Sequence, residues 1–408
     1  MSRRVVVTGM GGVTALGLDW PTIRTQLSIG ATATQYMASW ERYSGVNTRL
    51  AAPIEGFSVE GRYPRKKTRT MGPVALMSTF ASERAIEQAG LVDDPVLKEG
   101  RTGIAYGSSF GSPEPVLAFA ELKMQGFSRT LNASSYIQMM SHTAAVNMGL
   151  FFGITGRIIP TSSACTSGSQ AIGYAYEAIQ GGKCDLMIAG GAEELDVTQA
   201  AVFDTLFATS TRNNHPATTP RPYDRDRDGI VIGEGATTLV LEERDRAIAR
   251  GALVLAEIVG FACNSDGDHI TKPKAETMAT VMRLSLADAE LDAGAIGFVS
   301  GHGTATEDGD IAETKATSAV LGTAMPIHSL KSYFGHTLGA CGALEAWLGI
   351  EMMRESWFPP TANLVNVDER CAPLDYVMGA ARHADIEYFM SNNFAFGGIN
   401  TSLIFKRV

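Results

Sequence analysis

Short apolar runs and longer amphipathic segments alternate along most of the chain. Runs rich in Val, Ile and Ala end in glycine or small polar residues, and they predict buried strands at residues 4–8, 102–109, 157–160, 185–189 and 237–241. Residues 71–89 and the segment after residue 166 carry apolar side chains at helical spacing, which predicts helices. Strand, helix and strand over residues 157–189 form a β-α-β unit. Such a unit indicates a parallel sheet covered by helices.

The same order of elements recurs from about residue 252, which indicates an internal duplication. Residues 254–259 correspond to residues 5–8, residues 296–300 to 103–106, and the segment 326–350 to the segment 158–179. Each member of the last pair has a strand, a small-residue turn and a long helix. We therefore predict an α/β protein of two related halves, residues 1–251 and 252–408, whose equivalent turns meet at the centre.

A glycine-rich stretch, GMGGVTALG at residues 9–17, follows the first predicted strand. It lacks the GxGxxG spacing of dinucleotide sites, because Thr14 stands where the third glycine belongs, and the expected acidic residue about twenty positions on is missing. We interpret this stretch as a packing turn.

Composition and charge exclude several classes of protein. The formal net charge of -9 argues against a nucleic-acid binder. The five cysteines are scattered without CxxC or CxxH spacing, so we expect no disulfide framework, no metal site and a reducing compartment. No apolar run has the length needed to cross a bilayer, and the run after Arg3 and Arg4 is soon broken by glycines. We expect a soluble, cytoplasmic protein without membrane insertion.

Three residues stand out as candidates for chemistry. Cys165 lies where a strand gives way to a helix, and unpaired N–H groups and the helix dipole there favour the nucleophilic thiolate. His302, in GHGTAT, and His336, in KSYFGHTLGA, both lie in glycine-rich turns at strand ends. A single cysteine or histidine in such a place is more often a packed core residue. Two histidines, both at strand ends in glycine-rich turns, are harder to explain as packing, and together with Cys165 they favour a catalytic constellation.

Several motifs in one order then make a specific signal: VVVTGMGGVTALG, SSACTSG, RDGIVIGEG, GHGTATEDGD, KSYFGHTLGACGALE, NNFAFGGIN and SLIFKRV. With these motifs the chain resembles the elongating β-ketoacyl-acyl carrier protein synthases, the condensing enzymes of fatty acid and related polyketide or polyene synthesis. The resemblance covers essentially the whole chain. It implies the thiolase-like fold, a duplicated five-layered α-β-α-β-α arrangement, and a homodimer, or a heterodimer with a related subunit.

The resemblance also implies a role for each matched residue. Cys165 takes the acyl chain, while His302 and His336 stabilise the enolate that forms when malonyl-carrier protein loses its carboxyl group. Lys331 lies beside the second histidine, and Glu313 and Asp310 order the centre. The N–H groups of Cys165 and Phe396 form the oxyanion hole, and Phe396, Gly397 and Gly398 form a gate. Thr304 and Thr306 bind the pantetheine arm, His269 and Thr271 lie near the tunnel mouth, and Met140 lies near the partner's acyl pocket.

The expected partner is an acyl carrier protein, which is strongly acidic. The basic cluster RYPRKKTR at residues 62–69 suits such a partner, and we expect docking at Lys66 and Arg69, with Arg129 as a separate candidate. The substrates carry phosphopantetheine, so no separate cofactor is expected.

Two other functions share this fold. A coenzyme A-dependent thiolase uses a second cysteine as base, for which Cys341 is the candidate here. A chain-length-factor-like subunit is a non-catalytic partner that typically lacks the nucleophile, and the presence of Cys165 counts against it. The chain departs from the family pattern at Ala395, Ile399 and Lys272. These departures favour a specialised pathway over bulk fatty acid synthesis.

Overall fold

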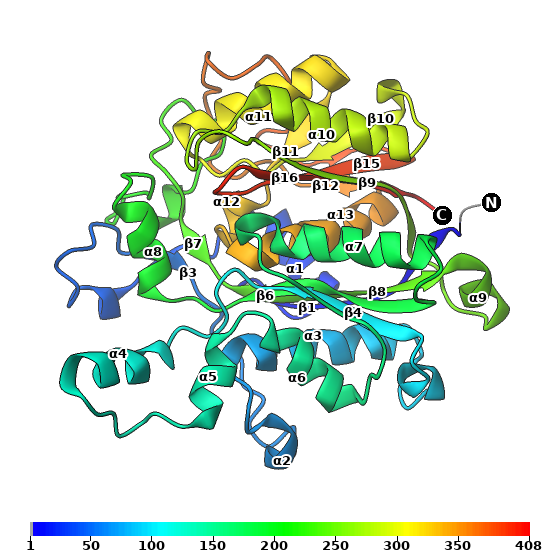
Figure 1. Ribbon diagram of the computed structural model, residues 1–408. Helices are drawn as coiled ribbons and strands as arrows, with labels where there is room; N and C mark the ends of the chain where they lie inside the picture. Colours follow the sequence, from blue (N-terminus) through cyan, green and yellow to red (C-terminus); the bar gives the residue numbers. More distant parts are fainter. Residues whose placement is uncertain (1–2) are drawn as a thin grey trace.

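The computed structural model describes residues 3–408 and arranges them around one 11-stranded sheet (Figure 1). The strand order is β13-β11-β10-β15-β16-β9-β1-β8-β6-β4-β5. Val5, Val6 and Val7 of β1 pair antiparallel with β9, and this short contact joins the two halves of the sheet. Figure 1 shows the two halves in separate layers.

The two halves of the sheet have the same topology. The first half contains β1 (Val5–Thr14), β4 (Thr102–Gly107), β5 (Ile158–Thr161), β6 (Leu186–Glu193) and β8 (Gly235–Glu243). The second contains β9 (Ala256–Ser265), β10 (Ile296–Ser300), β11 (Pro326–His328), β15 (Tyr388–Phe394) and β16 (Ile399–Lys406). In the first half β5, β4 and β6 are parallel neighbours, and β8 and then β1 follow antiparallel. In the second half β11, β10 and β15 are parallel neighbours, and β16 and then β9 follow antiparallel. The repeat therefore pairs the segments that the sequence pattern paired.

Helices fill three layers around the two sheet layers (Figure 1). The central layer holds α7 (Ser167–Gln180) and α13 (Cys341–Glu355). One outer layer holds α10 (Ala275–Asp288) and α11 (Glu307–Leu321), and the other holds α3 (Pro73–Gln88) and α6 (Thr143–Phe152). Every residue of α13 from Cys341 to Met353 is buried, as expected for a helix between two sheets. The α-β-α-β-α order confirms the predicted fold class.

The first strand is longer than predicted. β1 continues through the glycines to Thr14, so the interpretation of residues 9–14 as a turn is wrong. The glycines are needed because α3 lies directly against the strand. A Cβ atom on Gly9 would lie 2.1 Å from the carbonyl oxygen of Ala85, and one on Gly11 would lie 2.5 Å from that of Ala81.

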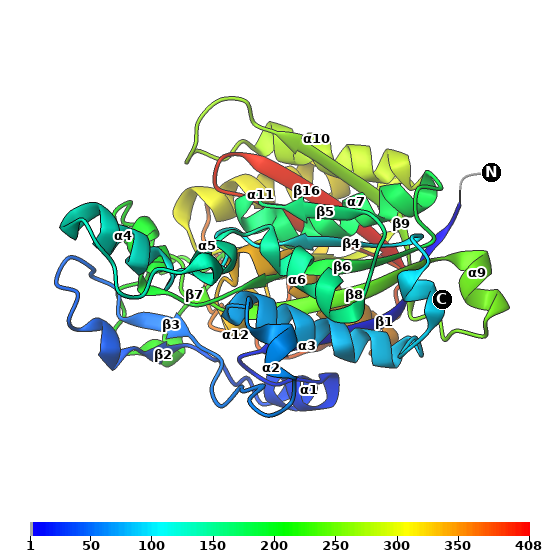
Figure 2. The ribbon, with the colours of Figure 1, turned by 60° about the horizontal axis from the view of Figure 1, so that its bottom comes forward.

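The remaining elements surround these layers. Further helices are α1 (Trp20–Ser28), α2 (Arg65–Thr68), α4 (Val116–Gln125), α5 (Ala133–Met139), α8 (Val197–Asp204), α9 (Arg244–Ala249) and α12 (Lys331–Phe334). Short strands are β2 (Gln35–Tyr36), β3 (Leu50–Ala52), β7 (Ile232–Gly233), β12 (Trp357–Phe358), β13 (Asp375–Tyr376) and β14 (Arg382–His383). Figure 2 shows α4 extending to one side of the sheet layers. Within residues 3–408, no helix combines the length and apolar character required to span a membrane.

Candidate active site

Cys165 and His336 are presented by the two equivalent turns of the duplicated fold. Cys165 lies in a 3-10 turn, Ala164–Thr166, directly before α7. His336 lies just before the corresponding 3-10 turn, Leu338–Ala340, which leads into α13. The turns pack backbone to backbone, because a Cβ on Gly168 would lie only 2.9 Å from the carbonyl oxygen of Gly339. The predicted meeting of the two turns is thus observed.

The imidazole of His336 contacts the thiol directly. Its Nε2 lies 3.0 Å from Sγ of Cys165. Its Nδ1 accepts the backbone N–H of Leu338 at 3.2 Å, so Nδ1 carries no proton and Nε2 of the neutral ring does. Burial, and then the nearby Lys331 cation, hold the pKa of His336 well below its ordinary value. His336 therefore presents an N–H donor rather than a base.

His302 stands beside this pair, after the end of β10. Its ring is nearly perpendicular to that of His336, with centroids 5.2 Å apart. Glu313 fixes the backbone, because its carboxylate accepts the N–H of His302 at 2.5 Å and that of Gly303 at 2.7 Å. Asp310, one turn earlier on α11, accepts the N–H of Thr304 at 3.0 Å. Both acids are buried, and burial raises the pKa of Glu313 to about 7 and that of Asp310 to about 6.

A buried network of polar side chains contacts His302. Lys331 pairs with one carboxylate oxygen of Glu345, on α13, and both side chains are almost fully buried. The other oxygen of Glu345 accepts Nδ2 of Asn393 at 2.6 Å. Nδ2 of Asn393 also lies 3.4 Å from Nδ1 of His302, so this ring too keeps its proton on Nε2. Although burial alone lowers the pKa of Lys331, the Glu345 carboxylate raises it above its ordinary value, and the lysine stays charged.

The sequence argument missed Glu345 and Asn393. Glu345 is four residues after Cys341 inside the GACGALE motif, and an acid at that place in an otherwise apolar helix is the signal that identifies a buried partner for a lysine.

The environment of the Cys165 thiol differs from the expectation in one respect. Burial raises its pKa to about 11, although the backbone N–H of Phe396 and the Lys331 cation act in the opposite direction. The sequence argument expected a thiolate at the helix start. The side chain is enclosed, and loss of hydration outweighs the favourable N–H groups there. A weaker lowering comes from the N–H of Cys165 itself.

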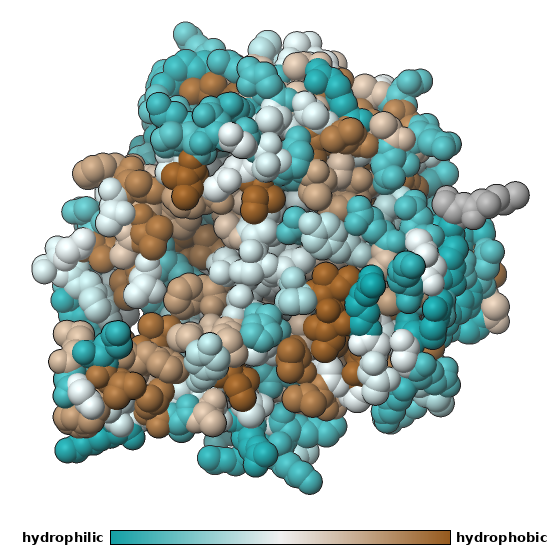
Figure 3. Space-filling model, in the orientation of Figure 1, coloured by the Kyte–Doolittle hydropathy of each residue, from teal (hydrophilic) through white to brown (hydrophobic). Residues whose placement is uncertain are grey.

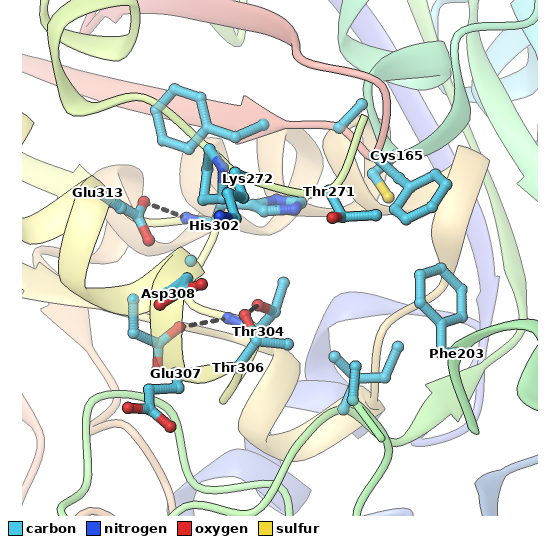
Figure 4. Close-up of a pocket in the computed structure, with 18 of the residues that line it drawn as sticks. Cys165, Phe203, Thr271, Lys272, His302, Thr304, Thr306, Glu307, Asp308 and Glu313 are labelled. Atoms are coloured by element: carbon cyan, nitrogen blue, oxygen red, sulfur yellow. Dashed lines mark hydrogen bonds between the residues drawn. The ribbon is translucent and has the colours of Figure 1, made fainter. Parts of the chain in front are cut away.

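A cavity of about 480 Å³ leads from the surface to these three residues (Figure 4). Predicted residues that line it are Cys165, His302, His336, Thr304, Thr306, Asp310, Glu313, His269, Thr271, Phe396 and Gly398. Figure 4 shows Cys165 and His302 on one side of the open space and Thr304 and Thr306 opposite. The hydroxyls of Thr304 and Thr306 lie 2.8 Å apart. The structure thus brings the predicted thiol, imidazoles and threonines to one cavity.

Two loops meet at the cavity beside the nucleophile. The ring of Phe396 contacts that of Phe203 edge to face, with centroids 5.8 Å apart. The N–H of Gly397 donates to the carbonyl of Ile270 at 2.9 Å, and the N–H of Asp266 donates to that of Gly398 at 2.8 Å. Residues 266–270 and 396–398 are therefore tied to each other.

Other predicted residues lie away from the cavity. Met140 follows α5 and is half-buried. Lys66 and Arg69 lie on or next to α2, and Arg129 lies between α4 and α5; all three are exposed and form no ion pair within residues 3–408. None of these four residues lines the cavity.

The donor atoms at the centre are close enough to raise the question of a metal. Cys165, His302 and His336 form one possible ligand group, and His302, Cys341 and Glu345 form another. The tautomers oppose coordination, because Nε2 of each ring carries its proton while Nδ1 faces a donor. Sγ of Cys341 donates to the carbonyl oxygen of Cys165 at 3.2 Å, which ties it to the backbone of the nucleophile.

Comparisons with known proteins agree with this geometry. The β-ketoacyl synthase N-terminal domain matches residues 2–247, and its C-terminal domain matches residues 255–365. The chain is 36% identical to 3-oxoacyl-[acyl-carrier-protein] synthase 2 of Vibrio cholerae over 100% of this chain and 99% of the relative. A crystal structure of a β-ketoacyl synthase from Burkholderia phymatum STM815 is 60% identical, with a TM-score of 0.98 and full coverage of both chains. The ishigamide ketosynthase/chain length factor is 29% identical, with a TM-score of 0.91 and full coverage of both. This chain belongs to the β-ketoacyl synthase family.

Proposed function

We propose that this protein is a β-ketoacyl-[acyl carrier protein] synthase in which Cys165, His302 and His336 carry out the reaction. The acyltransferase class follows from the family and from the full-length relatives. One observation supports the residue roles above all others. The thiol of Cys165 lies 3.0 Å from an imidazole N–H, at a cavity that a second imidazole also lines.

The first step is transfer of the acyl chain to Cys165. Its sulfur attacks the thioester carbon of an acyl-carrier protein, the bond to the carrier's sulfur breaks, and the carrier leaves as a thiol with the proton of Cys165. The oxyanion that forms is stabilised by the N–H groups of Cys165 and Phe396. Both groups already lower the pKa of the thiol, so they are directed at the reacting sulfur. Loss of one such donor typically costs about a hundred- to thousand-fold in rate.

The second step is decarboxylation and condensation. Malonyl-carrier protein loses carbon dioxide, and the electron pair of the broken bond leaves an enolate whose oxygen accepts hydrogen bonds from the Nε2–H groups of His302 and His336. Two neutral N–H donors suit this step because decarboxylation itself generates the carbanion. That carbon attacks the acyl-Cys165 thioester, and the Cys165 sulfur leaves as a thiolate that takes up a proton from solvent to restore the thiol. The product is a β-ketoacyl chain two carbons longer.

Other residues position these reactants. Thr304 and Thr306 hold the pantetheine arm in the cavity, and Phe396 with Gly397 and Gly398 forms the gate. Glu313 and Asp310 fix the backbone around His302. Burial, and then the charge of Lys331, lower the pKa of both imidazoles and keep them neutral.

The assembly is also part of the proposal. The name of the Vibrio cholerae relative supports an acyl carrier protein as partner, and that of the ishigamide protein supports a subunit partner. We infer a homodimer with Met140 near the partner's pocket. β5 lies at the free edge of the sheet with Ile158 exposed, which leaves a strand edge for a second chain. Four points stay predictions: docking of the carrier at Lys66, Arg69 and Arg129, a boundary between residues 251 and 252, a cytoplasmic location and the absence of a cofactor.

Mass spectrometry of the carrier protein tests the function. Wild-type protein incubated with acyl- and malonyl-carrier proteins should give a β-ketoacyl-carrier protein and carbon dioxide, and Cys165→Ala should give no condensed product. Condensation by Cys165→Ala would overturn the assignment. Cleavage of acetoacetyl-coenzyme A by the wild type, lost in Cys341→Ala, would instead identify a thiolase. A set of acyl chains differing in length and unsaturation tests the specialised pathway, which a clear preference for saturated chains would reject.

A further inference from the structure

A buried tyrosine packs against the loop that carries His302. Tyr223 lies in the segment between α8 and β7, and its side chain is fully buried. It does not line the cavity. Its hydroxyl lies directly against the glycines on either side of His302, because a Cβ atom on Gly301 would lie 2.3 Å from it and one on Gly303 would lie 2.6 Å from it. Tyr223 has no role in the reaction proposed above, although it contacts the backbone that presents an imidazole.

Tyr223 also contacts both acids that fix this loop. Its hydroxyl donates to Oε2 of Glu313 at 3.2 Å, and its backbone N–H donates to Oδ2 of Asp310 at 2.7 Å. The same Oε2 accepts the N–H of Gly303 at 2.7 Å, and Oε1 accepts that of His302 at 2.5 Å, a contact shown in Figure 4. The Glu313 carboxylate therefore accepts these three hydrogen bonds, and Tyr223 supplies the one that comes from a side chain.

The surrounding fold holds Tyr223 in this place. Its φ of 65° is uncommon for a bulky residue, and strained backbone of this kind persists only where several contacts fix it. Its carbonyl oxygen accepts the N–H of Asp368 at 3.0 Å, and its ring contacts that of Tyr376, with centroids 5.3 Å apart. Figure 3 shows a largely hydrophilic surface where α11 lies in Figure 1, but Tyr223 is 0% exposed and Glu313 is 2% exposed. The contact between the hydroxyl and the carboxylate is thus closed to solvent.

The Glu313 carboxylate is the group in this network that titrates near neutral pH. Burial raises its pKa to about 7, and the charge of Asp310 acts in the same direction. The backbone N–H groups of His302 and Gly303 and the Lys331 cation lower this pKa. A further donor to the ionised carboxylate, such as the Tyr223 hydroxyl, favours the charged form as well.

The other titratable groups packed here keep one state near pH 7. Burial raises the pKa of Tyr223 and of Tyr376, so both phenols keep their protons. Burial lowers the pKa of His302, whose ring stays neutral. Burial raises the pKa of Asp310 only to about 6, and this acid faces Arg227 at 3.5 Å. A change in rate near pH 7 therefore reports the carboxylate that the Tyr223 hydroxyl contacts.

We propose that Tyr223 is a positioning residue for the condensation, whose hydroxyl holds the Glu313 carboxylate against the backbone of His302. This inference rests on the proposed function. In the charged form Glu313 accepts the N–H groups on both sides of the loop, and the imidazole keeps its Nε2–H directed at the enolate oxygen. When Glu313 takes up a proton, the acid loses acceptor capacity and the loop loses this support.

The pH dependence of carbon dioxide release from malonyl-carrier protein tests this role. Tyr223→Phe keeps the ring and the backbone N–H to Asp310 but removes one donor to the charged carboxylate. The pKa of Glu313 should then rise by about one unit from its value of about 7. The rate should fall as the pH falls through about 7 in the wild type and through about 8 in the variant. The variant should be about fivefold slower at pH 7 and close to the wild type at pH 9, with KM unchanged because Tyr223 does not line the cavity.

The matched control is Tyr376→Phe, which removes a hydroxyl from the neighbouring ring. That hydroxyl donates to the carbonyl oxygen of Ala372 at 2.6 Å, so its loss should leave the pH profile unchanged. A profile of Tyr223→Phe that coincides with that of the wild type overturns the proposal. So does the same shift in both variants, or an equal loss of rate at every pH together with a lowered Tm, because Tyr223 would then contribute packing alone.

Infrared titration without substrate separates this inference from the proposed function. The carboxyl band that disappears in Glu313→Gln identifies Glu313, and its midpoint should lie about one pH unit higher in Tyr223→Phe than in the wild type. If the wild type releases carbon dioxide but neither the midpoint nor the rate profile shifts, only the inference about Tyr223 fails. If the wild type releases no carbon dioxide, the proposed function fails.

Discussion

The buried pair of Lys331 and Glu345 should control both stability and the state of the imidazoles. Glu345→Gln keeps the size of the side chain but removes the charge that neutralises Lys331. Both side chains are at most 2% exposed, so the variant leaves a cation without a counter-charge or solvent. Breaking a buried pair in this way costs about 3–5 kcal/mol. The variant also weakens the hydrogen bond that holds Asn393, whose side chain in turn positions His302. A loss of about 1.4 kcal/mol in transition-state stabilisation through His302 lowers the decarboxylation rate about tenfold.

Urea unfolding and carbon dioxide release from malonyl-carrier protein measure these two effects. The matched control is Glu351→Gln on the same helix, whose partner Arg354 is 39% exposed and can be hydrated, so we expect a loss below about 1 kcal/mol. The double variant Lys331→Met/Glu345→Leu removes both buried charges, so it should recover most of the stability. It should not recover the activity, because Asn393 still lacks the carboxylate that held its side chain. If Glu345→Gln unfolds and decarboxylates like the wild type, the reasoning is wrong.

Three further predictions follow from single contacts. Alkylation of Cys165 by iodoacetamide should rise about tenfold per pH unit from pH 7 to 10 and level off only near the raised pKa of about 11, because the thiolate reacts and its fraction grows up to that value; a plateau near pH 8.5 would contradict the effect of burial. Gly9→Ala should cost more than about 2 kcal/mol in urea unfolding, since its Cβ would lie 2.1 Å from the oxygen of Ala85, whereas Gly45→Ala, with open space around it, should cost little. Cys341→Ala should slow acylation about two- to fivefold, with partial recovery in Cys341→Ser, because one weak hydrogen bond to Cys165 is lost; a loss of a thousandfold in quenched-flow acylation would point to a base.

The pattern of apolar runs predicts much of the fold. Strand, turn and helix recur in the two halves in the same order, and this repetition predicts that the turns of Cys165 and His336 meet. The glycines after the first predicted strand do not form the turn that their sequence indicates. Gly9 and Gly11 are residues typical of a turn, but in the structure they allow α3 to lie directly against β1. The sequence around them does not show this, because α3 begins more than sixty residues later in the chain.

The supporting shell of the site was harder to predict for the same reason. Glu345 and Asn393 meet Lys331 and His302 only through tertiary packing. The apolar surroundings of Glu345 indicate a buried partner without naming it, and Asn393 stands in no unusual local context. The state of Cys165 also depends on enclosure, which a local helix-dipole argument does not include.

Peptide mass spectrometry tests the central claim most directly. After incubation with acyl-carrier protein and rapid quenching, the acyl mass should appear on the peptide that contains Cys165, and it should disappear on addition of malonyl-carrier protein as the β-ketoacyl product forms. An acyl group found on Cys341, or on no cysteine while product still accumulates, would contradict the account.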